Sequence, residues 1–241
     1  MIVVTWNMQG ATSQGENKWR ADVKRLFNAG VNVACLQECG SPPPGAAVID
    51  PPAWLGGEPP DGVDARYLFW NSGTETRPFI IYIFWLHSDQ GGNRNNLAIA
   101  SVGVQPINLL YAAPGIAGGR PAIGAGFARG GDVTENICTL HAFSGNGNDG
   151  PGLLANINAI AEAWFTAGDY NCAPTTWGVP SSQSPHVYPA GTNYCPHDNV
   201  ATYPSSGADL DYAFRNPGPT VIGKVNTNFV ASDHFPVFYQ I

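Results

Sequence analysis

In two segments of the chain, the spacing of apolar residues predicts a helix. Apolar residues recur three or four positions apart over residues 16–29, which places one face of an α-helix against a core, and they are Trp19, Val23, Leu26 and Phe27. Gly30 follows as a natural helix stop. A second helix is predicted over residues 151–163, with Asp149 as its N-cap and Pro151 in its first turn.

Runs of β-branched and aromatic residues predict many short strands around these helices. The predicted strands are 2–6, 31–36, 67–70, 79–86, 96–102, 121–127, 136–141, 164–167, 210–214, 221–225 and 235–239. Residues 41–66 and 172–207 are rich in Pro and other turn formers, which predicts two long surface loops. No break in composition marks a boundary, so we expect one domain over residues 1–241, an α+β sandwich of packed sheets flanked by helices.

Composition narrows the possible partners. The 241 residues are 44% apolar, enough for a packed core, but only 12% are charged, with 18 acidic and 11 basic residues and a net charge of −7. This balance argues against a basic groove as the main source of affinity for nucleic acid. The longest apolar run, residues 79–86, is far shorter than the ~20 residues of a membrane span, so we expect no integral membrane segment. A leader before Met1 was either removed or never existed, and the sequence leaves both alternatives open.

The five cysteines follow no zinc-binding spacing. Cys172 and Cys195 bracket the second predicted loop, and a disulfide between them would stabilise the fold by ~3 kcal/mol. We expect this pair to be bonded, which would favour an oxidising compartment.

Polar residues with catalytic chemistry recur where the predicted strands end or begin. They are Asn7, Glu38, His141, Asp169, Asn171, Asp211, Asp233 and His234. Carboxylate and amide oxygens suit Mg²⁺ or Ca²⁺, and histidines with acidic neighbours suit proton transfer at a phosphate. Any one of them has a structural alternative, such as a turn or an ion pair, but together they predict metal-assisted phosphodiester hydrolysis at one rim of the sheets.

Five motifs, in order along the chain, resemble those of the DNase I-like endonuclease/exonuclease/phosphatase superfamily. They are Thr5-Trp6-Asn7-Met8-Gln9-Gly10, Leu36-Gln37-Glu38, Gly168-Asp169-Tyr170-Asn171, Leu210-Asp211-Tyr212-Ala213 and Ser232-Asp233-His234-Phe235-Pro236-Val237. Further stretches resemble the catalytic B subunits of cytolethal distending toxins, among them Gln37-Glu38-Cys39-Gly40, Arg94 before Asn96-Leu97-Ala98, and Gly118-Gly119-Arg120-Pro121. The resemblance covers nearly the whole chain and implies a single DNase I-like catalytic domain, a four-layer α/β/β/α sandwich.

The resemblance implies a role for each candidate residue. Glu38 would bind Mg²⁺, with Ca²⁺ or Mn²⁺ as alternatives, helped by Asn7 and Asp233. The catalytic residues would be Asp169 and Asn171 at the attacking water, His141 and His234 at the transition state and leaving oxygen, and Asp211 as the hydrogen-bond partner of His234. Arg94 and Arg120 would touch the backbone of the substrate.

One position departs from the superfamily pattern. An acidic residue that orients the first histidine is usual ahead of the Leu-x-Trp-Asn strand, whereas this chain has Tyr67 there and Asp64 nearby. We therefore expect His141 to have Asp64, the Tyr67 hydroxyl or no partner at all beside its ring.

The resemblance implies a secreted, toxin-like, Mg²⁺-dependent endodeoxyribonuclease that cleaves DNA with little sequence specificity inside target cells, in the nucleus, and that delivery subunits of a toxin complex would carry. The main alternative is a phosphatidylinositol-phosphate phosphatase that uses the same site. A third hypothesis, a catalytically inactive binding module, is disfavoured because the candidate histidines and carboxylates are all present.

Overall fold

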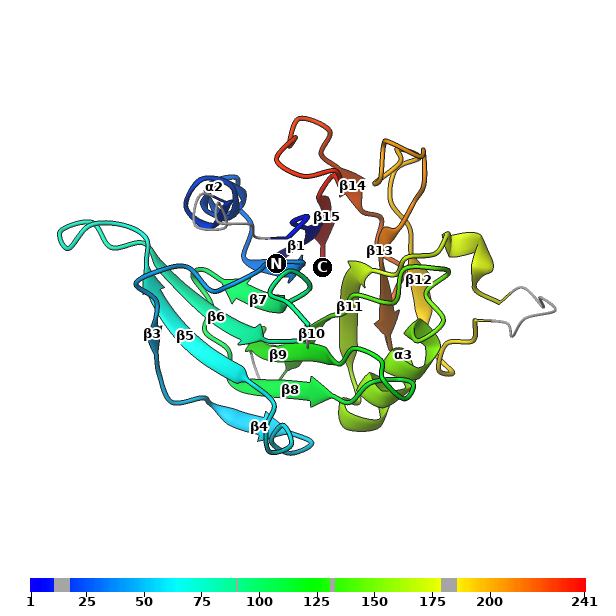
Figure 1. Ribbon diagram of the computed structural model, residues 1–241, viewed down its shortest axis with the longest axis horizontal. Coiled ribbons are helices and arrows are strands. Elements are labelled where there is room, and N and C mark those ends of the chain that lie inside the picture. Colours follow the sequence, from blue (N-terminus) through cyan, green and yellow to red (C-terminus); the bar gives the residue numbers. More distant parts are fainter. Residues whose placement is uncertain (11–17, 90, 131–132, 179–185) are drawn as a thin grey trace.

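The computed structural model describes residues 1–10, 18–89, 91–130, 133–178 and 186–241, which form two β-sheets (Figure 1). The first sheet has the strand order β14 (Lys224–Val225), β15 (Val237–Gln240), β1 (Ile2–Asn7), β2 (Val33–Gln37), β7 (Leu97–Ser101), β6 (Ile80–Leu86), β5 (Ala65–Asn71) and β3 (Ala47–Val48). The second has the order β12 (Asn193–Cys195), β13 (Asp211–Asn216), β11 (Trp164–Asp169), β10 (Thr134–Thr139), β9 (Ala122–Ala128), β8 (Asn108–Ala112) and β4 (Ala53–Leu55).

Three apolar clusters separate four layers. Cys35 and Phe84 of the first sheet share one cluster with Ile137 and Phe165 of the second, so the two sheets pack face to face. The outer face of the first sheet packs on the N-terminal helical segment, and the outer face of the second packs on α3 (Gly150–Ile160). The helices therefore cover opposite sides of the sheet pair (Figure 1), and the predicted α/β/β/α sandwich is confirmed.

The first predicted helix is present in the described part of its range. A π-helical segment, η1 (Lys18–Val23), continues into α2 (Lys24–Asn28), while residues 16 and 17 lie outside the described residues. The predicted apolar face is buried on the first sheet. Gly30 has a φ of +93°, the left-handed conformation in which glycine stops a helix without strain.

The second predicted helix is confirmed, and Asp149 occupies the predicted N-cap position, although its side chain does not cap the helix. Pro151 lies in the first turn of α3, as expected. Asp149 makes no side-chain capping bond; its Oδ1 instead accepts the backbone N–H of Phe143 at 2.8 Å. This contact ties the start of α3 to the chain that leaves His141.

Every predicted strand matches an observed strand to within a few residues, and four short strands were missed. β3, β4 and β12 have two or three residues each, too few for a period to be visible, and the five residues of β8 show no alternation of apolar and polar positions. The predicted loops 41–66 and 172–207 therefore contain edge strands, and the second also contains the 3₁₀ turn η2 (Pro174–Thr176).

The predicted disulfide between Cys172 and Cys195 is wrong, because both thiols are free. Cys172 packs in the cluster between the second sheet and α3, where its sulfur lies 3.3 Å from the Tyr212 hydroxyl. Cys195 packs in the cluster between the two sheets. The thiols thus lie on opposite faces of the second sheet, and a disulfide requires both Cβ atoms within about 4.5 Å.

The part of the chain that the structure describes contains no helix with the length and apolar content that a bilayer crossing requires.

Candidate active site

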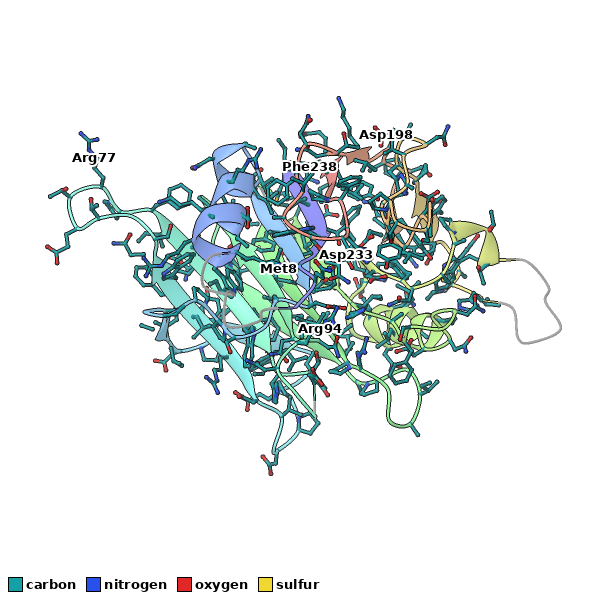
Figure 2. The ribbon with its side chains drawn as sticks, turned by 45° about the horizontal axis from the view of Figure 1, so that its top comes forward. Met8, Arg77, Arg94, Asp198, Asp233 and Phe238 are labelled. Carbon is teal, nitrogen blue, oxygen red and sulfur yellow. The ribbon has the colours of Figure 1, made fainter. Side chains whose placement is uncertain are left out.

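A cavity of about 420 Å³ opens where strand ends of both sheets meet. The predicted residues that line it are Asn7, Glu38, Arg94, Arg120, His141, Asp169, Asn171, Asp233 and His234. Asp211, the remaining predicted residue, is buried beneath His234. Figure 2 labels Arg94 and Asp233 close to Met8, at the end of β1, although these residues come from distant parts of the chain.

Backbone turns at the strand ends help to place the cavity side chains. Glu38 directly follows β2 with a φ of +48°, and Asn171 follows β11 by two residues with a φ of +51°. Residues other than glycine rarely adopt this left-handed conformation, and strained conformations of this kind cluster at active sites. An isolated parallel bridge between His141 and Asp169 joins the chain after β10 to the end of β11.

His234 and Asp211 form a buried hydrogen-bonded pair. His234 Nδ1 donates to Asp211 Oδ2 at 2.6 Å, while Thr202 Oγ1 accepts the Asp211 backbone N–H. Burial alone would lower the pKa of His234, but the Asp211 carboxylate outweighs it, with Asp169 and Asp233 adding to the effect, and the pKa rises to about 9. The imidazole is therefore cationic at neutral pH, and its Nε2 proton is available for donation.

His141 is buried in a different electrostatic setting. Its Nε2 lies 3.6 Å from Asp169 Oδ2 and 3.8 Å from Glu38 Oε1, too far for hydrogen bonds. Its Nδ1 has no hydrogen-bond partner among the described residues. Burial, aided by the charges of Arg120, His234 and Arg94, lowers its pKa well below the ordinary value, so this imidazole is neutral.

At the position that departs from the superfamily pattern, neither candidate residue forms a hydrogen bond with the His141 ring. Asp64 pairs with Arg66 at 2.6 Å instead of reaching the imidazole. The Tyr67 hydroxyl is itself buried without a hydrogen-bond partner in the described part of the chain. Of the three alternatives for the His141 ring, the structure has the one without a partner on Nδ1.

Asp169 joins the residues of both sheets. Its Oδ2 accepts a hydrogen bond from Asn7 Nδ2 at 2.8 Å, and its Oδ1 accepts the backbone N–H of Asn171 at 2.9 Å. Burial, reinforced by the charge of Asp211, raises the pKa of Asp169 despite the nearby His234. A carboxylate with a raised pKa accepts a proton more readily than an ordinary aspartate.

Glu38 is paired with one of the two predicted phosphate-binding arginines. Arg94 Nε donates to Glu38 Oε2 at 2.6 Å, and this contact raises the pKa of the guanidinium. The Glu38 side chain is 11% exposed and the Arg94 side chain 61%. Arg94 also packs against Gly10, where a Cβ atom would lie 2.5 Å from Arg94 Cγ.

Arg120, the second predicted arginine, also borders the cavity. Its Nη1 donates to the backbone oxygen of Ala142 at 3.3 Å, and its guanidinium carbon lies 5.5 Å from the centre of the Phe143 ring. The side chain is therefore held in place while most of its N–H groups stay available for an anion.

The oxygens at the cavity fit a hard divalent cation. Glu38, Asp233 and Asn7 supply two carboxylates and an amide to the same cavity, the ligand type that Mg²⁺ prefers. Ligand atoms of Asp169, Asp211 and His234 also lie within 4.8 Å of one another. An ion among these three would have to replace the 2.6 Å hydrogen bond of the pair, so the Glu38 side of the cavity fits a metal better.

Sequence reasoning missed other residues that line the cavity, namely Asn95, Ser144, Tyr203 and Leu210. The centre of the Tyr203 ring lies 4.8 Å from that of His234. Tyr203 falls inside the long predicted loop 172–207, where no periodicity indicates which side chains turn inward. The loop also contains Trp177, Tyr188 and Tyr194, so its aromatic character did not single out Tyr203 either.

Comparisons with known proteins agree with the resemblance inferred from the motifs. No family model matches the chain. The chain is 30% identical over 254 residues to the B subunit of the cytolethal distending toxin of Escherichia coli, covering 98% of this chain and 89% of the relative. It is 31% identical over 249 residues to a homologue of that protein from Salmonella typhi, covering 98% of this chain and 88% of the relative.

Solved structures give the same result. The crystal structure of cytolethal distending toxin from Actinobacillus actinomycetemcomitans has a chain that matches with a TM-score of 0.80 and 29% identity, covering 99% of this chain and 97% of that one. An endonuclease/exonuclease/phosphatase family protein from Leptotrichia buccalis matches with a TM-score of 0.64 and 14% identity, covering 100% and 99%, which confirms the DNase I-like fold. By sequence identity and coverage, the chain belongs to the family of cytolethal distending toxin B subunits.

Proposed function

We propose that the chain is a Mg²⁺-dependent phosphodiesterase that cleaves DNA with little sequence preference. The observation that carries the proposal is the cavity itself, which presents hard oxygen ligands on one side and a cationic His234 held by Asp211 on the other. The coarser assignment, a hydrolase of the nuclease/phosphatase type, follows from the family and the fold.

Glu38, Asn7 and Asp233 would hold the metal. When bound, the cation would neutralise charge on the scissile phosphate. Glu38 offers Oε1 for this purpose, since Oε2 is engaged by Arg94. Asn7 supports Asp169 through its amide nitrogen, so its Nδ2 ties the metal side of the cavity to the side that binds water.

In the proposed reaction, one residue would accept a proton and another would donate one. Asp169, whose pKa is raised, would accept the proton of the attacking water, while Asn171 would orient that water or a phosphate oxygen. His234, whose pKa is about 9, would donate a proton to the leaving oxygen. His141, neutral and buried, would hydrogen-bond to the transition state.

The test offers supercoiled plasmid and a soluble inositol phosphate side by side, each with Mg²⁺. We expect the plasmid to be nicked, nicking to stop in excess EDTA, and Glu38→Ala to lose most activity with partial recovery at high Mg²⁺. Phosphate release from the inositol compound without nicking would replace the nuclease proposal by the phosphatase. Nicking in excess EDTA would overturn the metal-dependent mechanism.

The names of the relatives support a proposal about where this chain acts and which subunits accompany it. They are B subunits of cytolethal distending toxins. We therefore propose that this chain is secreted, travels with delivery subunits and acts on nuclear DNA of target cells. Purification of the chain from its native source tests this proposal, since co-purifying subunits are expected, and a chain isolated alone from culture medium would contradict it.

A further inference from the structure

Thr202 lies in the second long predicted loop, outside the five motifs, yet it is fully buried. Its Oγ1 accepts the backbone N–H of Leu210 at 2.9 Å and that of Asp211 at 3.1 Å. Its backbone oxygen accepts the backbone N–H of Phe235 at 2.8 Å. A single residue therefore holds the chain at Asp211 and the chain directly after His234.

The contacts of Thr202 join the two sheets where the hydrogen-bonded pair of Asp211 and His234 forms. Asp211 begins β13 of the second sheet, whereas His234 lies just before β15 of the first sheet. The two side chains can meet only if these chain segments keep a constant separation. Thr202 bonds to both segments, the first through its side chain and the second through its backbone.

The Asp211 carboxylate depends on its backbone for its position. Its Oδ2 accepts the hydrogen bond from His234 Nδ1 at 2.6 Å, but its Oδ1 is buried without a hydrogen-bond partner in the described part of the chain. Hydrogen bonds to a charged group weaken when distance and angle change. The hold of Thr202 Oγ1 on the Asp211 N–H therefore also maintains the bond to the imidazole.

The turn that follows Thr202 is closed by its own hydrogen bonds. The backbone N–H of Tyr203 donates to the oxygen of Ala208 at 2.9 Å, and the N–H of Ala208 donates back to the oxygen of Tyr203 at 3.2 Å. The ring of Tyr203 lies against that of His234, with their centres 4.8 Å apart. A closed turn restricts the backbone beside it, so Thr202 offers its two oxygens in fixed positions.

We propose that Thr202 is a positioning residue, which keeps the Asp211 carboxylate and the His234 imidazole in place relative to each other and so holds the His234 Nε2 proton ready for the leaving oxygen. The inference rests on the proposed function and adds a residue that does not line the catalytic cavity. Thr202 acts only through the pair.

The experiment measures kcat and KM of the full chain with Mg²⁺ on two diesters. A short oligodeoxynucleotide has an alkoxide as leaving group and needs an acid, whereas bis(p-nitrophenyl) phosphate releases a nitrophenolate that is stable without a proton. Thr202→Val preserves the shape of the side chain but leaves two buried N–H groups without their acceptor. It should lower kcat for the oligonucleotide ~10-fold, at unchanged KM, and change the small diester little.

Thr202→Ser keeps the hydroxyl and should restore oligonucleotide cleavage. The matched control is Thr192→Val, because Thr192 Oγ1 accepts Asn216 Nδ2 at 3.1 Å at the end of β13 farthest from Asp211. This control also removes a buried hydrogen bond, so it should lower the melting temperature without favouring either substrate. Equal losses by Thr202→Val on both diesters, or no loss on either, would overturn the positioning role.

A double variant shows whether Thr202 acts through His234. In a His234→Ala background, Thr202→Val should have little further effect on oligonucleotide cleavage, since residues that act as a unit lose activity together. A full second loss would contradict the proposal. If Thr202→Val fails to fold, Thr202→Cys takes its place, because a thiol is a weaker acceptor of similar size, and the same selective loss is expected.

The outcomes also separate this inference from the function on which it rests. A wild-type chain that hydrolyses neither diester overturns the proposed function. Equal losses by His234→Ala on both diesters overturn His234 as the acid, and the role of Thr202 with it. A selective loss in His234→Ala, with no selective loss in the Thr202 variants, overturns the positioning role alone.

Discussion

Replacing Arg94 with glutamine should tighten the binding of a divalent cation to the free protein. Arg94 neutralises Glu38 through the 2.6 Å contact between Nε and Oε2, and Glu38 is the central proposed metal ligand. A cation that approaches Glu38 therefore meets a positive charge that already occupies one of its oxygens. Removing that charge leaves the carboxylate to the metal alone.

The expected change in metal affinity depends on how exposed the Arg94 side chain is. Two unit charges about 4 Å apart interact by about 4 kcal/mol at an effective dielectric constant of about 20. Because the Arg94 side chain is 61% exposed, solvent screens most of this energy. Exposed pairs measure about 0.2–1 kcal/mol, and the upper value corresponds to a roughly fivefold lower Kd for the metal.

Titration of the free protein with Mn²⁺, followed by calorimetry or electron paramagnetic resonance, measures this Kd without substrate. Arg77→Gln is the matched control, since Arg77 lies on an exposed loop far from Arg94 (Figure 2). The same Arg94→Gln variant should nick plasmid more slowly and show a salt dependence shallower by about one phosphate contact. Metal binding that stays equal or weakens would refute the competition between Arg94 and the cation.

Three further predictions concern the proton-transfer residues and the thiols. His141→Ala and His234→Ala should each slow plasmid nicking ~10²-fold or more, and the double variant should lose far less than the product, because both serve one transition state; independent losses would place them in separate sites. Plasmid nicking should fall as the pH rises through about 9, where His234 loses its proton. Asp211→Asn should move this alkaline fall in activity to lower pH, because it removes the charge that raises the pKa of His234. An alkaline fall at unchanged pH would exclude His234 as the acid. Dithiothreitol should leave the melting temperature unchanged, since Cys172 and Cys195 are free, and a lower value would reveal a disulfide.

The sequence predicted the framework of the site because strand ends are readable without knowledge of neighbouring strands. Asn7 closes a run of β-branched and aromatic residues, Glu38 follows a buried run, and Asp169 ends a short apolar strand. A polar residue at such a point has only the rim of the sheet to occupy, since its neighbours are in the core. The ordered motifs then supplied the pairing of His234 with Asp211, which residue types alone could not.

The errors arose where long-range packing decides the outcome. Loop length between Cys172 and Cys195 is compatible with a disulfide, yet the sequence does not reveal that β12 turns Cys195 to the inner face of the second sheet while Cys172 faces α3. The contact between Arg94 and Glu38 was missed for the same reason. A loop before β7 brings the arginine to a strand end 56 residues earlier, and no local pattern encodes that distance.

The electrostatics of the site would allow an acidic chain to bind a phosphate diester under the proposed mechanism. The chain carries a net charge of −7, and four carboxylates lie in or beneath the catalytic cavity, at Glu38, Asp169, Asp211 and Asp233. Without a metal, these charges repel a phosphate, and Arg94 is occupied by Glu38. A divalent cation on Glu38 Oε1 would offset two of the negative charges and weaken the attraction of Glu38 for Arg94, which would leave the guanidinium more available to the substrate. Metal and diester should then each raise the affinity of the other by the same factor, as linkage requires. Under the proposed function, the affinity of this chain for DNA should therefore depend on the cation more than on any basic surface.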